Sequence, residues 1–190
     1  MTQSSIKGVA FQSVAEDIHR LRTEGRIRQD DLMAVLKPGD MAHLEETVVP
    51  SLWYPIDVYG RCLDLLCIVE GHGRPSYLVA RGAKAAERMM AVGAYRHFLA
   101  AADRWGQRAG QAMVQLASAM YNFMIWVITH EESTGTCRIE VQQAADFPDS
   151  ARHSAHGFVE VLFTRIEGAP VEVGSRRPRP DLVMYEIRRR

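Results

Sequence analysis

Apolar side chains recur every three or four positions through the first two thirds of the chain, which is the spacing of an amphipathic helix. Glycine and proline separate the apolar runs, because glycine permits a left-handed helix stop and proline interrupts helical hydrogen bonds. The pattern predicts helices over residues 8–26, 30–37, 56–70, 76–90 and 93–107. It also predicts one or two helical turns over 41–48. Residues 109–120 either continue the preceding helix or form a connecting piece.

The helix predicted over 76–90 has small residues on its inward face. Ser76 can cap its first turn, because a serine hydroxyl can accept a hydrogen bond from an unpaired amide there. Gly82 lies on the inward face with alanine neighbours. Because glycine has no Cβ, this position predicts the close approach of another backbone.

The apolar spacing changes in the last third of the chain, where β-branched and aromatic residues favour strands. Apolar and polar side chains alternate in the segment that starts at Cys137, as they do in a half-buried antiparallel strand. The predicted strands cover residues 123–129, 137–143, 171–174 and 182–188, with a hairpin loop at 132–136 and a turn at 177–180.

A long helix is predicted between the two pairs of strands. Asp149 or Ser150 occupies the N-cap position, where a side-chain oxygen can accept a hydrogen bond from a first-turn amide. Gly168 ends the helix, and Pro170 prevents it from restarting. A single apolar stripe predicts that this helix lies on a flat sheet, and its members are Ala151, Ala155, Phe158, Leu162 and Ile166.

The order of elements predicts an α+β fold. An N-terminal helical layer, about residues 1–121, precedes a part of about 122–190 that runs strand, strand, helix, strand, strand. Such an order favours an antiparallel sheet with the long helix packed on it. The length of 190 residues suits one domain with a substantial core, and we expect a single domain over 1–190.

Composition and charge are those of an ordinary globular protein, with 47% hydrophobic and 24% charged residues. Lys plus Arg and Asp plus Glu number 23 each, so no net field attracts the chain to nucleic acid or to a membrane surface. The arginines near the C-terminus are either simply solvated or bind an anionic partner. They are Arg176, Arg177, Arg179, Arg188, Arg189 and Arg190.

The sequence favours a cytoplasmic location without membrane insertion. Its first residues lack the apolar segment of a signal peptide. The longest apolar run, near residues 121–129, is far shorter than the ~20 residues needed to cross a bilayer. The three cysteines fit a reducing compartment and have no spacing typical of a zinc site; they are Cys62, Cys67 and Cys137.

Scattered positions over nearly the whole chain resemble a myxobacterial family of uncharacterised proteins. They are Gly8-Val-Ala-Phe11, Tyr54-Pro55, Arg81-Gly82, Gly157-Phe-Val-Glu-Val-Leu and Gly168-Ala169. More broadly, the order of elements is similar to the fold of the heme nitric-oxide/oxygen-binding domains, the vinyl-reductase-like domains and the TRAPP trafficking subunits. That resemblance implies a cavity between helices and sheet, and often a homodimer. Fold alone does not assign a function.

The chain departs from each of these groups in its chemistry. It has no Tyr-x-Ser-x-Arg spacing, the motif that holds the heme propionates in the nitric-oxide sensors. It also has no cysteine after Cys137, whereas the vinyl-reductase-like domains often carry clustered cysteines near the carboxyl end. The resemblance to TRAPP subunits offers Cys62 or Cys67 as an acylated cysteine. The alternative is a buried thiol that packs as a small apolar group, and the sequence favours this alternative.

Histidines are the other candidate ligands. His97 lies on an apolar helix, as an axial ligand of heme iron does, or it is a hydrogen-bonded structural histidine. His153 and His156 are three residues apart and could share a metal, but no carboxylate is suitably spaced, so we expect exposed surface residues and no metal site.

Aromatic residues and methionines concentrate in the middle of the chain, where they either pack the core or line an adaptable apolar pocket. If there is a ligand, it is expected to be apolar and to bind in this region. The candidate ligand-binding residues are Trp53, Tyr54, Tyr59, Tyr95, His97, Phe98, Met120 and Trp126.

These patterns favour a non-enzymatic sensory or regulatory module that binds a small hydrophobic ligand between helices and sheet. The alternative is a homodimeric interaction scaffold without a ligand, and a third reading is a heme-based gas sensor that uses His97. No phosphate-binding loop or nucleophile–base pair is visible, so we expect no catalytic residues, and no cofactor unless it is that heme.

Overall fold

The computed structural model describes residues 3–91, 107–131 and 136–190, and in 107–113 it describes the backbone only. The described helices are α1 (Gly8–Thr23), α2 (Gln29–Val35), α3 (Ala42–Glu45), α4 (Ile56–Val69), α5 (Pro75–Ala91), α7 (Gln107–Met120) and α8 (Asp149–Glu167). The described strands are β1 (Ser5–Lys7), β2 (Trp53–Pro55), β3 (Ile125–Glu131), β4 (Thr136–Gln142), β5 (Val171–Arg179) and β6 (Leu182–Arg189). No helix in these ranges is long and apolar enough to cross a membrane.

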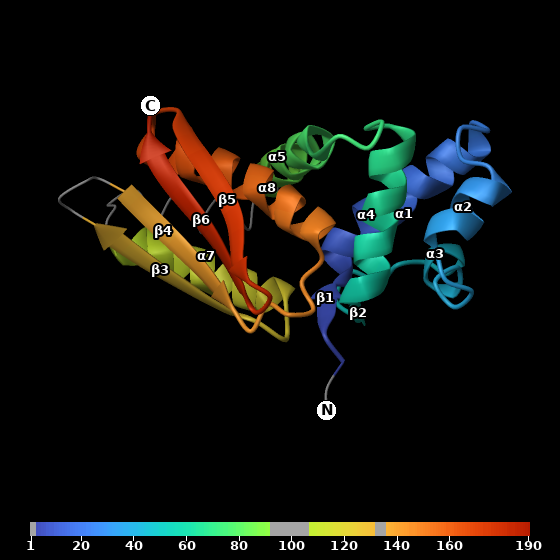
Figure 1. Ribbon diagram of the computed structural model, residues 1–190, viewed down its shortest axis with the longest axis horizontal. Coiled ribbons are helices and arrows are strands. Elements are labelled where there is room, and N and C mark those ends of the chain that lie inside the picture. The colour runs from blue at the N-terminus through green and yellow to red at the C-terminus, as the bar shows by residue number, and fades with distance from the viewer. Residues whose placement is uncertain (1–2, 92–106, 132–135) are drawn as a thin grey trace.

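The predicted α+β fold is confirmed. Four strands form one antiparallel sheet in the order β3-β4-β6-β5, so the two hairpins meet where β4 pairs with β6. Along β4, Cys137, Ile139 and Val141 are buried and alternate with more exposed residues, as a sheet with one covered face requires. Helix α8 lies between this sheet and α5, and helices α1 to α4 gather at the far end of the molecule (Figure 1).

Helix α8 begins and ends close to the predicted residues, but its N-terminus differs from the prediction. Pro148, in an extended conformation, holds the N-cap position, and Asp149 is the first helical residue. The Ser150 hydroxyl does not cap the helix, because it donates a 3.1 Å hydrogen bond to the carbonyl oxygen of Gly60 in α4. At the other end Gly168 has a φ of 62°, which confirms the predicted left-handed stop.

The single apolar stripe predicted for α8 is too narrow. Gly157, Val159 and Phe163 are buried in addition to the predicted positions Ala151 and Leu162. The extra burial arises because α8 packs on two sides, against the sheet and against α5 (Figure 1).

The close backbone approach predicted at Gly82 is confirmed, and its partner is α8. A Cβ at Gly82 would overlap the carbonyl oxygen of Ser154, and a Cβ at Gly157 would overlap that of Val79. The two glycines therefore let the backbones of α5 and α8 touch directly.

A small two-stranded sheet was not predicted. Strands β1 and β2 pair antiparallel with Ile6 opposite Tyr54, and each contains only three residues. So short a strand shows no alternation of apolar and polar residues that the sequence could reveal. Ile6 is nevertheless completely buried, and the amide of Gly8 donates to the carbonyl oxygen of Leu52 at 2.8 Å.

Two further boundaries differ from the predictions. Strand β5 continues through Pro178 to Arg179, so the turn falls at 180–181; a proline is tolerated there because β5 is an edge strand. Helix α5 starts at Pro75 itself, the first-turn position that proline favours, so Ser76 is not its cap. Most of the helix predicted at 93–107 and of the loop predicted at 132–136 lies outside the described residues.

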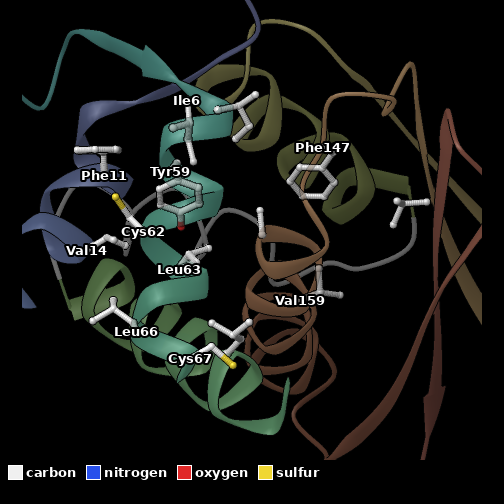
Figure 2. Packing of buried hydrophobic residues seen from close by; sticks show 14 of the residues in the cluster. Ile6, Phe11, Val14, Tyr59, Cys62, Leu63, Leu66, Cys67, Phe147 and Val159 are labelled. Carbon is white, nitrogen blue, oxygen red and sulfur yellow. The ribbon is translucent and has the colours of Figure 1, made fainter. Parts of the chain in front are cut away.

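The apolar core is built around α4. Phe11 and Val14 of α1 pack on one side of Tyr59, Cys62, Leu63 and Leu66, and Val159 of α8 lies beyond them, with Phe147 just before α8 (Figure 2). Apolar side chains of α1 and α4 thus pack toward α8.

We expect Gly82→Ala to destabilise the protein, because the new methyl group forces α5 away from α8. Overpacking of this kind costs about 2 kcal/mol in the free energy of unfolding, which chemical denaturation would measure. Gly174→Ala is the matched control, since a Cβ there meets no atom within 4 Å. Equal stability of the two variants would contradict direct contact of the helices.

Candidate functional site

A cavity of about 330 Å³ lies where the N-terminal helices meet α8 and the sheet. Helices α1, α4, α5, α7 and α8 and strand β3 all contribute to its wall. The described lining residues are Val9, Ala10, Ser13, Tyr59, Arg81, Ala85, Arg88, Met89, Leu116, Ala117, Met120, Tyr121, Trp126, Ser154, Ala155, Phe158 and Val159.

The structure brings together three of the predicted ligand-binding residues, Tyr59, Met120 and Trp126, in the wall of this cavity. The predicted residues Tyr95, His97 and Phe98 lie outside the described residues.

Trp53 and Tyr54 lie elsewhere, in β2. Trp53 is 41% exposed, and the Nζ atom of Lys7 lies 4.0 Å from the centre of its ring. The Tyr54 ring stacks on Phe11 at 4.9 Å between centroids, and its hydroxyl accepts a hydrogen bond from the amide of Val49. Strand pairing with β1, which the sequence did not predict, directs these two rings away from the cavity lining.

The Trp126 ring stacks on two tyrosine rings. Its indole stacks on Tyr121 at 6.2 Å and on Tyr185 at 6.1 Å, with interplanar angles of 24° and 4°. The indole nitrogen is buried and has no hydrogen-bond partner among the described residues. An unpaired buried donor costs about 1–3 kcal/mol, so this wall of the cavity is fixed by ring packing rather than by polar contacts.

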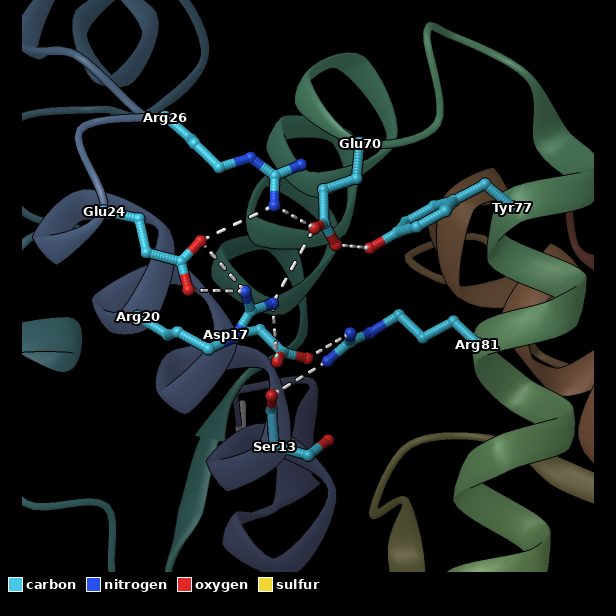
Figure 3. Close-up of polar contacts among 8 residues, drawn as sticks. All are labelled: Ser13, Asp17, Arg20, Glu24, Arg26, Glu70, Tyr77 and Arg81. Carbon is cyan, nitrogen blue, oxygen red and sulfur yellow. Dashed lines mark hydrogen bonds and ion pairs between the residues drawn. The ribbon is translucent and has the colours of Figure 1, made fainter.

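Arg81 carries a charge into the cavity wall, but that charge is balanced. Its guanidinium is 10% exposed, forms an ion pair with Asp17 of α1 and donates to the carbonyl oxygen of Ser13 at 2.9 Å (Figure 3). Burial alone would raise the pKa of Asp17, but hydrogen bonds and charge from Arg81 and then Arg20 outweigh it. The pKa of Asp17 therefore lies below its usual value.

Glu70 extends this network to the end of α4. Its carboxylate accepts a 2.7 Å hydrogen bond from the Tyr77 hydroxyl and lies 3.2 Å from Arg26 and 3.7 Å from Arg20 (Figure 3). Burial, and then this hydrogen bond, raise the pKa of Tyr77 to about 12. The network ties α1, α4 and α5 together beside the cavity.

Arg88 is the other charged residue in the described lining, and it is not among the predicted site residues. It lies two helical turns beyond Arg81 on α5, is exposed, and makes no hydrogen bond or ion pair with any residue that the structure describes. The sequence contains one signal for its position: Arg88 follows Arg81 by seven residues, and residues seven apart lie on the same face of a helix.

The cysteines do not form part of the described cavity wall. Cys62 and Cys67 of α4 and Cys137 of β4 are all buried. Burial raises the pKa of the Cys62 thiol and of the Cys137 thiol to about 12. A thiol that stays protonated at neutral pH is a poor nucleophile, so these side chains act as small apolar groups.

His153 and His156 are half-buried, so the expectation of an exposed pair is wrong. The His156 Nδ1 atom lies 3.3 Å from the hydroxyl of Ser175 in β5, and the His153 Nε2 atom lies 3.1 Å from a guanidinium nitrogen of Arg152 in α8. Burial lowers the pKa of both histidines, and Arg152 lowers it further. The described residues contain no group of side chains that could hold a metal ion.

Solved structures with the same arrangement are H-NOX proteins. The Fe(II) unliganded H-NOX protein from K. algicida superposes with a TM-score of 0.66 at 10% identity, covering 97% of both chains. An H-NOX variant from T. tengcongensis gives 0.61 at 9% identity over 97% of this chain and 98% of that one. The S. oneidensis protein in the Fe(II)NO state gives 0.57 at 10% identity over 97% and 99%.

The chain has the H-NOX fold. No protein-family model matches the sequence, and no curated protein is significantly similar to it. The similarity to a myxobacterial family stays a prediction. The chain is identical to these H-NOX proteins at about one residue in ten. The fold therefore determines the arrangement of the elements, and this chain's own residues determine the chemistry of the cavity.

We expect Asp17→Asn to lower the free energy of unfolding by about 2 kcal/mol, because it leaves the guanidinium of Arg81 without its counter-charge. The control is Glu24→Gln, which removes an exposed pair with Arg20 and should cost less than about 0.5 kcal/mol.

The effect of Asp17 also depends on pH. Because its pKa is lowered on folding, its ionised form stabilises the protein fully above the unfolded pKa of about 3.9. This stabilisation is lost as the pH falls through the lower folded value. Denaturation at neutral and acid pH should show the gap between wild type and Asp17→Asn closing in acid, and a constant gap would contradict the pairing.

Proposed function

We propose that this protein is a non-enzymatic sensory or regulatory module that binds a small, mainly apolar molecule in the cavity. The observation that carries the proposal is the cavity itself, which five helices and one strand help to build. Its wall combines aliphatic, aromatic and methionine side chains with few polar groups, the composition typical of small-molecule sites.

The size of the cavity limits the ligand. Ligand pockets span about 300–1,000 Å³, so 330 Å³ lies at the small end. A dry cavity of about 150 Å³ binds benzene, which suggests room here for about two such rings or a chain of roughly ten carbon atoms.

The chemistry of the described wall supports binding rather than catalysis. It contains hydroxyl groups from Ser13, Ser154 and two tyrosines, and two arginines. Among the described lining residues there is no histidine, cysteine or carboxylate that could act as a base toward those hydroxyls.

The size of the cavity speaks against heme, although the H-NOX structures were determined in Fe(II) and Fe(II)NO states. Space for about two benzene rings is too small for a four-pyrrole macrocycle. His97, the candidate axial ligand, lies outside the described residues. We therefore propose a ligand other than heme, and a Soret band in the purified protein, lost in His97→Ala, would contradict this.

We expect Ala117→Leu to weaken binding of 1-aminonaphthalene at least tenfold; this is a neutral two-ring dye whose fluorescence shifts to shorter wavelength in apolar surroundings. Ala117 of α7 is 6% exposed and lines the cavity, so the three added carbon atoms take up space that the dye needs. Ala119→Leu is the matched control, because Ala119 lies on the same helix and is exposed. A fluorescence titration would measure both affinities, and native mass spectrometry would detect a co-purified molecule.

Dye binding by wild type and Ala119→Leu, together with at least a tenfold loss in Ala117→Leu, supports the proposal. Failure of the wild type to bind the dye or any co-purified molecule would contradict it, as would equal binding by all three proteins.

A homodimeric scaffold is the second candidate, favoured by an exposed apolar patch. Its residues meet where the β2 loop crosses the start of α1, and are Val9, Val49, Leu52 and Trp53, which are 45%, 41%, 54% and 41% exposed. Exposed apolar patches often mark protein interfaces.

If the patch is a dimer interface, Leu52→Asp should convert a dimer to a monomer in size-exclusion chromatography with light scattering, because it places a charge in an apolar contact. Ile68→Asp is the control, since Ile68 is 53% exposed on α4, outside the patch. A monomeric wild type at high protein concentration would exclude the scaffold.

A further inference from the structure

The described cavity wall carries one positive charge that no neighbouring residue balances. Arg81 and Arg88 are its only charged members within the described residues. Arg81 is paired with Asp17, whereas Arg88 makes no ion pair or hydrogen bond with a described residue. Within the described wall there is therefore an excess positive charge of one, at Arg88.

The two arginines also differ in exposure. They are seven residues apart on α5, about 10.5 Å along the helix axis, with Ala85 between them on the same wall. Arg81 is 10% exposed in its side chain, whereas Arg88 is an exposed residue. Of the two arginines in the described wall, Arg81 is therefore the buried one and Arg88 is the one in contact with solvent.

We infer that the ligand is an amphiphile with a single negative charge, a carboxylate whose head group pairs with Arg88 and whose apolar chain of about ten carbon atoms fills the cavity. This inference rests on the proposed function, since it specifies what the cavity binds.

Charge balance favours a monoanion. One unpaired guanidinium matches one negative charge, and a second negative group deeper in the cavity would be buried without a partner. A planar carboxylate suits the guanidinium because it can accept two parallel hydrogen bonds. At Arg88 the head group also stays partly hydrated, so binding requires little desolvation of the charge.

The rest of the wall suits a flexible chain. Met89, Leu116, Met120 and Phe158 supply apolar contacts, and methionine side chains adapt to an unbranched chain. No described lining residue other than the paired Arg81 presents a charge to the chain.

Displacement of 1-aminonaphthalene by decanoate, decanol and decyltrimethylammonium tests the inference. The three compounds share the same apolar chain and differ in the charge of the head group. We expect decanoate to bind most tightly and the cation most weakly. Arg88→Gln should weaken decanoate about fivefold, because the pair is exposed and its strength is limited, and should change decanol by less than about twofold.

Lys84→Gln is the matched control, since Lys84 lies on the same helix, is exposed and does not line the cavity. It removes the same charge from the protein, so it measures the long-range effect of net charge alone. Arg88→Lys should restore part of the decanoate affinity, and added salt should reduce the preference for decanoate.

The two proposals fail in different ways. If wild-type protein binds neither the dye nor any ten-carbon compound, the cavity is not a binding site and the proposed function falls. If decanoate and decanol bind equally well, or Lys84→Gln weakens decanoate as much as Arg88→Gln does, the cavity still binds apolar molecules and the role of Arg88 is overturned.

Discussion

The structure depends on the direct contact between the backbones of α5 and α8 at Gly82 and Gly157. Because neither residue has a Cβ, the two helices approach until the carbonyl oxygens of Val79 and Ser154 fill the space. Helix α8 also covers the sheet, so this contact sets the distance between the helical layer and the sheet. Residues beside it on both helices line the cavity, which therefore exists only while the two helices keep this spacing.

Electrostatic pairing then decides how the wall of the cavity is charged. The ion pair between Arg81 and Asp17 joins α5 to α1 across 64 residues of sequence and neutralises the buried arginine of the wall. Arg88, on the same face of α5, has no such partner among the described residues. The described wall of this apolar volume therefore contains one buried arginine that is paired and one exposed arginine that is not.

The H-NOX fold appears here with about 90% of its residues different from those of the solved H-NOX proteins. Such divergence is possible because the fold requires helices with apolar faces and a sheet with one covered side, which many sequences satisfy. The proposed binding site has no such freedom, since particular side chains would select its ligand. The shared fold therefore says little about the ligand, and the chemistry of the wall says more.

The sequence by itself determined the elements whose signals are local. The apolar spacing of α1, α4 and α8, the alternation in β4 and the left-handed stop at Gly168 all act within a few residues, and all were predicted. The close approach at Gly82 was also predicted, but only the tertiary structure shows that α8 is its partner. Pairing of β1 with β2 placed Trp53 and Tyr54 outside the cavity lining, while stacking fixed Trp126 in its wall. Periodicity shows which side of an element is apolar. The residues that pack against that side are determined by contacts between segments that are far apart in the chain.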